Sequence, residues 1–330
     1  MSAGNEVRVD PLTGLKAIIA TGRAARPGAW DRLEAPPPID PARDPFAPGN
    51  EGETPPEVHA LRVNGGPPDT PGWQVRVVPN LYPALAPAAE PPEPDAEPDL
   101  FTATPAAGAH EVIVNAPDPV HSLADLTAEQ VGIAMSVWRE RMRAHAATAA
   151  CVHVLVNEGH DGGASLPHTH AQLYALDFVP AGIARERERF GAHAVRTMGG
   201  NLLGDLVQEE VRRRERLVAV DDEAVLLAPY ASRLPYQLLL APRRPRAHFE
   251  EDGPLGAALL HDALQRLRRR FGAVPPLNLW VRTAPRGAEQ FCWRIDIVPR
   301  LTQLAGLELG TGVHLCVIAP EQAAEELRAG

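Results

Sequence analysis

Residues 151–176 read CVHVLVNEGHDGGASLPHTHAQLYAL, and our interpretation of the whole chain starts from them. Two apolar runs flank a glycine-rich loop, and the second run begins with His-x-His-x-Gln. Apolar runs separated by turn residues predict two antiparallel strands joined as a hairpin with a long loop. Alternate residues of a strand share a face, so His168, His170 and Gln172 are expected to lie together beside the loop.

This segment contains the groups that a phosphoryl transfer through a covalent intermediate requires. A neutral imidazole such as His170 can attack phosphorus if its other ring nitrogen is held by an acceptor. The Gln172 amide can donate to a phosphoryl oxygen, and the Ser165 hydroxyl can donate to a departing phosphate. Flexible glycines, among them Gly163, let backbone N–H groups approach an anion.

Two other interpretations of the histidines stay open at this point. A zinc site would need further ligands, and the nearby His153 and His160 have no Cys or carboxylate partner at ligand spacing. The chain also has no Cys-x-x-Cys pair. The remaining interpretation is that the histidines lie in a loop and carry no chemistry.

Composition limits the class of protein. The chain has 330 residues, a formal net charge of -10 and a pI near 5.7, which argues against a general affinity for nucleic acid or anionic membranes. Arginine runs at residues 212–216 and 266–270 fall within helical patterns and are expected to be solvated faces. Three widely spaced cysteines, no signal-peptide pattern and no membrane-length apolar run predict a cytoplasmic protein.

The order of predicted elements repeats along the chain. In the first half, strands precede and follow a helix in LTAEQVGIAMSVWRERMRAHAA, where Thr127 and Gln130 form a capping-box pattern. In the second half, a helix near residues 254–271 again lies between strand pairs. This order predicts an α+β fold made of two related units. Residues 86–99, rich in proline and acidic residues, are expected to form an exposed loop.

The segment from Asn157 to Gln172 resembles the active-site motif of galactose-1-phosphate uridylyltransferases, N-x-G-x-x-x-G-x-S-x-x-H-P-H-x-Q, with Thr169 in place of the proline. Other stretches follow the family order, among them DPFAPGNEGETPPE and WRIDIVPRLTQLAGLELGTG. The resemblance implies a tandem pair of histidine-triad-like domains, each an antiparallel sheet with flanking helices. It places the nucleophile loop in residues 1–180 and the second domain in residues 181–330. It also implies a homodimer with shared active sites.

By this resemblance, the chain transfers UMP from a UDP-hexose to a hexose 1-phosphate through a uridylyl-His170 intermediate. A UDP-sugar and a sugar 1-phosphate are the expected partners, with neither nucleic acid nor membrane involved. The implied catalytic residues are His170, Gln172, Ser165 and His168. The implied substrate contacts are Arg23, Arg26, Asn80, Asn157, Gly163 and Glu308, the last supplied across the dimer.

Departures from the family pattern concern its metal sites and its sugar pocket. The four positions of the structural zinc site read Asp44, Ala47, Pro119 and His168. At a second metal site Glu186 is kept, but the histidine positions read Arg282, Arg294 and Asp296. We therefore predict no metal cofactor, with Arg294 paired to Asp296 or Glu186; His121 could restore a ligand only if its loop shifted. Leu307 replaces a tyrosine of the sugar pocket. The alternatives are a nucleotide-sugar or dinucleotide phosphorylase of the same superfamily, an ADP-sugar donor, or a catalytically inactive nucleotide-binding homologue.

Overall fold

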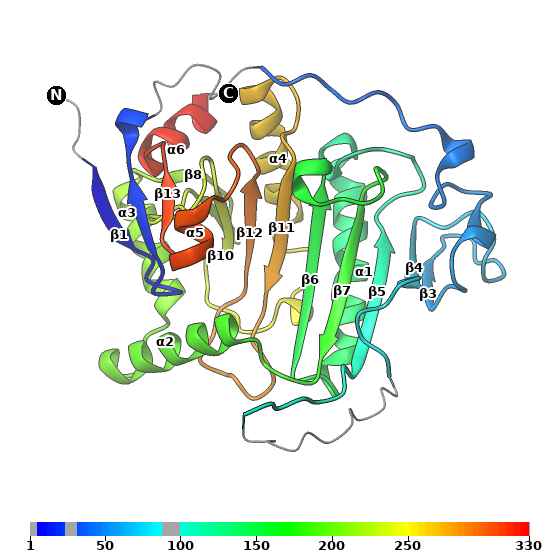
Figure 1. Cartoon of the computed structure of the whole chain (residues 1–330), viewed down its shortest axis with the longest axis horizontal. Coiled ribbons are helices and arrows are strands. Elements are labelled where there is room, and N and C mark those ends of the chain that lie inside the picture. The colour runs from blue at the N-terminus through cyan, green and yellow to red at the C-terminus, as the bar shows by residue number, and fades with distance from the viewer. Residues whose placement is uncertain (1–4, 24–31, 88–99, 330) are drawn as a thin grey trace.

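The computed structural model describes residues 5–23, 32–87 and 100–329. Its centre is a ten-stranded sheet in the order β3-β4-β5-β7-β6-β11-β12-β10-β9-β8 (Figure 1). The strands are β3 (His59–Leu61), β4 (Val75–Pro79), β5 (Gly108–Val114), β6 (Cys151–Glu158), β7 (His170–Leu176), β8 (Leu217–Val220), β9 (Ala224–Leu227), β10 (Leu238–Pro242), β11 (Leu277–Arg282) and β12 (Arg294–Pro299). All neighbouring pairs in this sheet are antiparallel. The predicted α+β class is confirmed.

The two halves of the chain contribute equivalent sets of strands. In the first half, α1 (Ala128–Ala146) connects β5 to β6; in the second, α4 (Ala257–Phe271) connects β10 to β11. The spatial orders β4-β5-β7-β6 and β9-β10-β12-β11 correspond, and β6 pairs with β11 where the halves meet. The halves thus share one continuous sheet, and a domain boundary at residue 180 stays a prediction.

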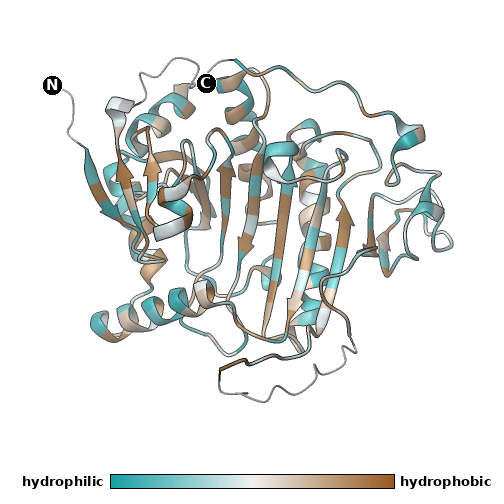
Figure 2. Ribbon diagram, in the orientation of Figure 1, coloured by the Kyte–Doolittle hydropathy of each residue, from teal (hydrophilic) through white to brown (hydrophobic). Residues whose placement is uncertain are grey.

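One face of the sheet is buried beneath α1 and α4. Val152, Val154 and Val156 of β6 belong to this core, together with Leu279 and Val281 of β11. Figure 2 shows hydrophobic residues concentrated on the central strands. Side chains alternate along a strand, so the residues that alternate with these, including Asn157 directly after Val156, project from the opposite face.

The opposite face of the second half is covered by other elements. These are the helices α2 (Ala181–Thr197) and α3 (Leu202–Arg213), whose Phe190 and Leu203 share an apolar cluster with Leu239 of β10. A small sheet in the order β1-β2-β13 lies on the same side of Figure 1. Its strands are β1 (Glu6–Val9), β2 (Lys16–Ile19) and β13 (His314–Cys316), and the C-terminal helices are α5 (Gly306–Thr311) and α6 (Pro320–Ala329).

Several local predictions can be compared with this structure. Thr127 caps α1 as expected, accepting from the Gln130 backbone N–H at 3.1 Å. The Gln130 side chain instead donates to the carbonyls of Gln74 and Asn115, so the reciprocal half of the capping box is wrong. The Pro-rich stretch lies mostly outside the described residues. In the part of the chain that the structure describes, no helix is both long and apolar enough to span a bilayer.

The expectation for the first arginine run is only partly correct. Arg212 and Arg213 are exposed, with 70% and 48% of their side chains accessible, and both pair with Glu209. Arg216 is buried and bridges Glu210 and Glu321, so it is not part of a solvated face. Arg216 is buried because α6, which contains Glu321 and comes from a distant part of the chain, packs against β8.

The packing of α4 onto the sheet predicts a stability effect. Leu264 is fully buried in the core, so Leu264→Ala is expected to lower the free energy of unfolding by about 2–5 kcal/mol through lost burial and a residual cavity. Arg269→Ala, at an exposed position of the same helix, should change it by less than about 0.5 kcal/mol. Urea unfolding followed by circular dichroism checks both, and equal effects of the two variants would contradict the packing described.

Candidate active site

His170 is the first residue of β7 and lies on the sheet face opposite α1. Its Nδ1–H donates to the His168 carbonyl at 2.8 Å, and Phe46 packs edge-on against the ring with centroids 5.2 Å apart. Nε2 has no hydrogen-bond partner among the described residues and is not fully sealed from solvent. Burial lowers the pKa of His170, which favours the neutral ring. The result is an imidazole with its lone pair on Nε2, the form that can attack phosphorus.

The His168 side chain is fully buried and engaged at both ring nitrogens. Nδ1 lies 2.7 Å from a carboxylate oxygen of Asp44, and Nε2 lies 2.9 Å from the Ala116 carbonyl. Each ring nitrogen is therefore within hydrogen-bond distance of a protein oxygen, and neither is left free for another ligand. Of the predicted catalytic residues, His168 therefore contacts the nucleophile through its backbone carbonyl, while its ring fixes that carbonyl in place.

Gln172 follows His170 on the same face of β7. Its Oε1 lies 3.1 Å from Nε2 of His110, a residue of β5, and 3.1 Å from the Tyr174 hydroxyl. The Asn80 amide nitrogen lies 3.2 Å from His110 Nε2, which brings this predicted substrate contact into the same group. His110 and Tyr174 were not among the predicted site residues. Tyr174 could have been found from its i+2 spacing to Gln172.

Asn157 lies on the neighbouring strand, on the face that carries His170. Val156 pairs with Ala171, and Asn157 pairs with Asn278 of β11 on its other side. The Asn278 amide donates to Asn157 Oδ1 at 2.8 Å. Four neighbouring strands from both halves of the chain, β5, β7, β6 and β11, therefore supply polar groups around His170.

The loop between β6 and β7 uses its glycines for close approach and for backbone shape. The short helix η5 (His160–Gly162) contains Gly162, where an added Cβ would lie 2.6 Å from the Leu277 carbonyl oxygen. Gly163 has φ +83° and is exposed, in the left-handed region that other residues rarely adopt. Gly162 is therefore required by its close approach to Leu277, and Gly163 by its backbone conformation.

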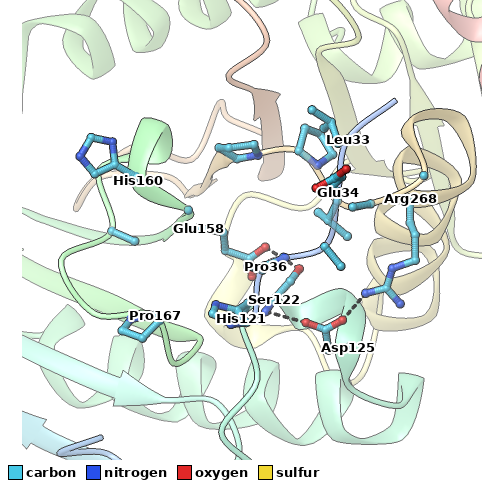
Figure 3. A pocket seen from close by; sticks show the side chains of 18 of the residues that line it. Leu33, Glu34, Pro36, His121, Ser122, Asp125, Glu158, His160, Pro167 and Arg268 are labelled. Atoms are coloured by element: carbon cyan, nitrogen blue, oxygen red, sulfur yellow. Dashed lines mark hydrogen bonds and ion pairs between the residues drawn. The ribbon is translucent and has the colours of Figure 1, made fainter. Parts of the chain in front are cut away.

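Ser165 lines a cavity of about 780 Å³ behind this loop (Figure 3). Glu158 forms part of its wall, where its carboxylate accepts from the Ser122 hydroxyl at 2.6 Å and the Leu123 N–H at 2.7 Å. Burial raises the pKa of Glu158 to about 7 in spite of these hydrogen bonds. His170 is not among the residues that line this cavity.

Of the other predicted contacts, Glu308 has no hydrogen bond to this group among the described residues. Arg23 ends the short helix η1 (Thr21–Arg23), and Arg26 lies outside the described residues. Glu308 lies on α5, where its carboxylate accepts from the Ala305 N–H at 2.9 Å. Partial burial acts to raise the Glu308 pKa, but backbone N–H donors, led by that of Ala305, hold the pKa below its usual range.

The sequence matches two family models. Residues 2–180 match the N-terminal domain of galactose-1-phosphate uridyl transferase, and residues 126–329 match a domain of unknown function, DUF4921. The chain belongs to the galactose-1-phosphate uridyl transferase family. This confirms the resemblance that the nucleophile loop indicated.

Similar proteins of this family cover almost the whole chain. An ADP-glucose phosphorylase of Arabidopsis thaliana is 28% identical over 98% of this chain and 92% of its own. A galactose-1-phosphate uridylyltransferase of Haemophilus influenzae is also 28% identical, over 98% and 93%. Among solved structures, that of the Arabidopsis ADP-glucose phosphorylase with bound ADP-glucose has a TM-score of 0.80, at 26% identity and 99% coverage of both chains. A uridylyltransferase structure has a TM-score of 0.75, at 26% identity, covering 98% of this chain and 97% of its own.

The residues at the family's metal positions do not fit a metal ion. Ala47 and Pro119 have no ligating side chain, and the His168 ring is fully engaged. His121 donates from Nε2 to the Pro37 carbonyl at 2.8 Å. Within the described residues, no three His, Cys, Asp or Glu side chains are grouped to hold a metal.

At the second position an arginine takes the place of ligands. Arg294 Nη1 lies 2.9 Å from Glu186 and Nε lies 3.0 Å from Asp296, which confirms its predicted pairing with these carboxylates. Arg282 Nε lies 3.4 Å from the other Glu186 oxygen. The Arg294 guanidinium is thus the counter-charge of the buried Asp296, and it shares Glu186 with Arg282.

Removing the positive charge of Arg294 should therefore lower the stability of the folded protein. We expect Arg294→Met to destabilise the protein by about 3–5 kcal/mol, because Glu186 and Asp296 lose their main buried partner. Arg294→Met/Asp296→Leu should recover part of this loss, since Glu186 keeps Arg282 as its partner and no carboxylate is left without a counter-charge. Chemical denaturation of both variants checks the pair, and a single variant as stable as the parent protein would contradict the assignment.

The metal prediction is tested on the purified protein. Elemental analysis after dialysis without chelator should find well below one equivalent of zinc or iron per chain. Adding a chelator should leave the unfolding midpoint unchanged, because no metal links Asp44 to His168. One equivalent of bound zinc or iron would show that this prediction is wrong.

Proposed function

We propose that this chain is a nucleotidyltransferase that takes a nucleoside monophosphate from a nucleotide-sugar onto His170. The observation that carries the proposal is the orientation of the ring, with Nδ1–H bound to the His168 carbonyl and Nε2 without a partner in the described chain. A neutral imidazole held in this way has one reactive lone pair and a fixed direction of attack. Its lowered pKa keeps the lone pair available near neutral pH.

The reaction proceeds in two displacements. In the first, Nε2 attacks the α-phosphorus, the bond from that phosphorus to the bridging oxygen breaks, and the sugar 1-phosphate leaves. In the second, a phosphate oxygen of the acceptor attacks the same phosphorus and the P–N bond breaks. The Gln172 amide is suited to stabilise the phosphoryl oxygens in both steps.

The first candidate pair is a UDP-hexose donor and a hexose 1-phosphate acceptor, as in the galactose-1-phosphate uridylyltransferases. The intact nucleophile loop and the polar residues Asn80 and Asn157 beside it support this choice. In this proposal Glu308 contacts the sugar from the second subunit of a homodimer. That arrangement is consistent with a carboxylate that has no contact with His170 in its own chain.

A second candidate is a nucleotide-sugar phosphorylase, in which inorganic phosphate replaces the hexose 1-phosphate. Two observations favour it: the similarity to an ADP-glucose phosphorylase along nearly the whole chain, and Leu307 at a sugar-pocket position. An apolar side chain there supplies no hydroxyl for a hexose acceptor.

The shared chemistry has a direct test. Incubation with UDP-glucose or ADP-glucose, without acceptor, should add the mass of one nucleoside monophosphate to the protein, located on His170 by peptide mass spectrometry. His170→Ala should form no adduct and lose turnover by more than about 10⁴-fold, since no nucleophile remains. His168→Ala should weaken the loop but keep some labelling. Turnover of His170→Ala near that of the parent protein would refute the assignment.

The mass of the adduct identifies the base, and the acceptor is then found by competition. The labelled protein is mixed with galactose 1-phosphate or with inorganic phosphate, and release of the nucleotide is followed. Release as UDP-galactose supports the first candidate; release as a nucleoside diphosphate on phosphate alone supports the second. A protein that binds UDP-glucose and ADP-glucose but never becomes labelled would be a non-catalytic homologue.

A further inference from the structure

The carbonyl end of the Gln172 amide is occupied by the protein itself. Oε1 lies 3.1 Å from His110 Nε2 and 3.1 Å from the Tyr174 hydroxyl. The amide nitrogen has no partner among the described residues. An amide whose oxygen is already bound can offer only its N–H groups to a ligand.

His110 determines this orientation because only one of its ring nitrogens can carry the proton. The Ala84 backbone N–H donates to Nδ1 at 3.2 Å, so Nδ1 accepts and the proton of the neutral ring is on Nε2. Burial lowers the His110 pKa and so disfavours the charged ring. Nε2–H faces the Gln172 oxygen at 3.1 Å and the Asn80 amide nitrogen at 3.2 Å, and of these two atoms only the Gln172 oxygen can accept. The ring is further held by stacking on Tyr174, with centroids 4.1 Å apart.

Asn157, on the other side of His170, is oriented by a similar arrangement. Asn278 donates from Nδ2 to the Gly162 carbonyl at 2.6 Å, while its own oxygen lies 3.4 Å from Arg300 Nη1. Both contacts fix which end of Asn278 is the nitrogen, and that nitrogen also donates to Asn157 Oδ1 at 2.8 Å. The Asn157 amide nitrogen then has no partner within the described chain.

We propose that His110, Tyr174 and Asn278 are positioning residues that hold the amides of Gln172 and Asn157 with their N–H groups toward the phosphate of a nucleotide-sugar. The inference rests on the proposed function and deepens it. A freely rotating amide would present its oxygen to the phosphate for part of the time, and that contact is repulsive. Donors fixed in advance avoid this state and need no reorganisation as charge develops. None of the three residues is required to touch the reacting atoms.

The test measures adduct formation on His170 in a rapid-quench experiment, with UDP-glucose or ADP-glucose labelled at the α-phosphate. Removing a whole transition-state donor costs about 10²–10³-fold, so losing only its orientation should cost less. We expect Tyr174→Phe to slow adduct formation at saturating donor about 5-fold and His110→Phe about 30-fold. Tyr230→Phe is the matched control, because the Tyr230 ring packs against Arg8 and Arg216 and has no hydrogen bond to this group among the described residues; it should react like the parent protein.

Asn278→Asp tests the second arrangement. A carboxylate cannot donate to Asn157 Oδ1, so the Asn157 amide must turn its N–H groups toward residue 278 and away from the site. We expect adduct formation to slow about 10-fold. Asn64→Asp introduces the same charge at an exposed loop position and should have no effect.

A double-mutant comparison separates positioning from general damage. In a Gln172→Ala background, Tyr174→Phe and His110→Phe should change the rate by less than about 2-fold, because the group they orient is absent. Equal slowing in both backgrounds would mean that the residues act through the fold, and rates like the parent protein in both would mean that they do not act at all; each result overturns the inference. Absence of any adduct in the parent protein would instead refute the proposed function.

Discussion

The hydrogen bond from His170 Nδ1–H to the His168 carbonyl determines which ring nitrogen is free to react. That carbonyl can serve as a fixed acceptor only because the His168 ring is itself held at both ends. Asp44 lies 124 residues earlier in the chain, and Ala116 lies two residues after the end of β5. The orientation of the His170 ring thus depends on the buried contact between His168 and Asp44. Orientation is set before a substrate arrives, which is the condition for efficient electrostatic catalysis.

The continuous sheet extends this principle to the donors around the nucleophile. β5, β7, β6 and β11 are neighbours in space, yet β11 comes from the second half of the chain. Each strand contributes a polar residue to the face that carries His170, while α1 and α4 pack the opposite face. A hydrogen-bonded sheet with a buried side has little freedom to change register. The spacing between His110, Gln172 and Asn278 is therefore a property of the whole fold.

The features that the sequence predicted arise within short segments, whereas those that it missed arise from contacts between distant segments. The two-residue spacing of His168, His170 and Gln172, and the strand order around the helices, follow from periodicities within short segments. His110 and Asn278 are far from the loop in sequence, and only cross-strand register makes them partners of Gln172 and Asn157. The same reason explains Arg216, which reads as one of a run of surface arginines until α6 packs beside it. Local pattern identifies the chemistry, and the groups that orient it come from pairing between distant segments.

At the positions that the family resemblance assigns to metal ligands, the described side chains bond to one another. A tetrahedral metal would fix several ligands at once, whereas here a carboxylate and an imidazole meet in one 2.7 Å contact, and one guanidinium bridges two carboxylates. Buried charges of this kind carry a desolvation penalty that their attraction barely offsets, so they contribute little net stability. Their directional hydrogen bonds nevertheless define one arrangement, because any other would leave a buried charge without a partner. The contact between Asp44 and His168 therefore holds the His168 carbonyl in one position. That position in turn determines the tautomer of His170.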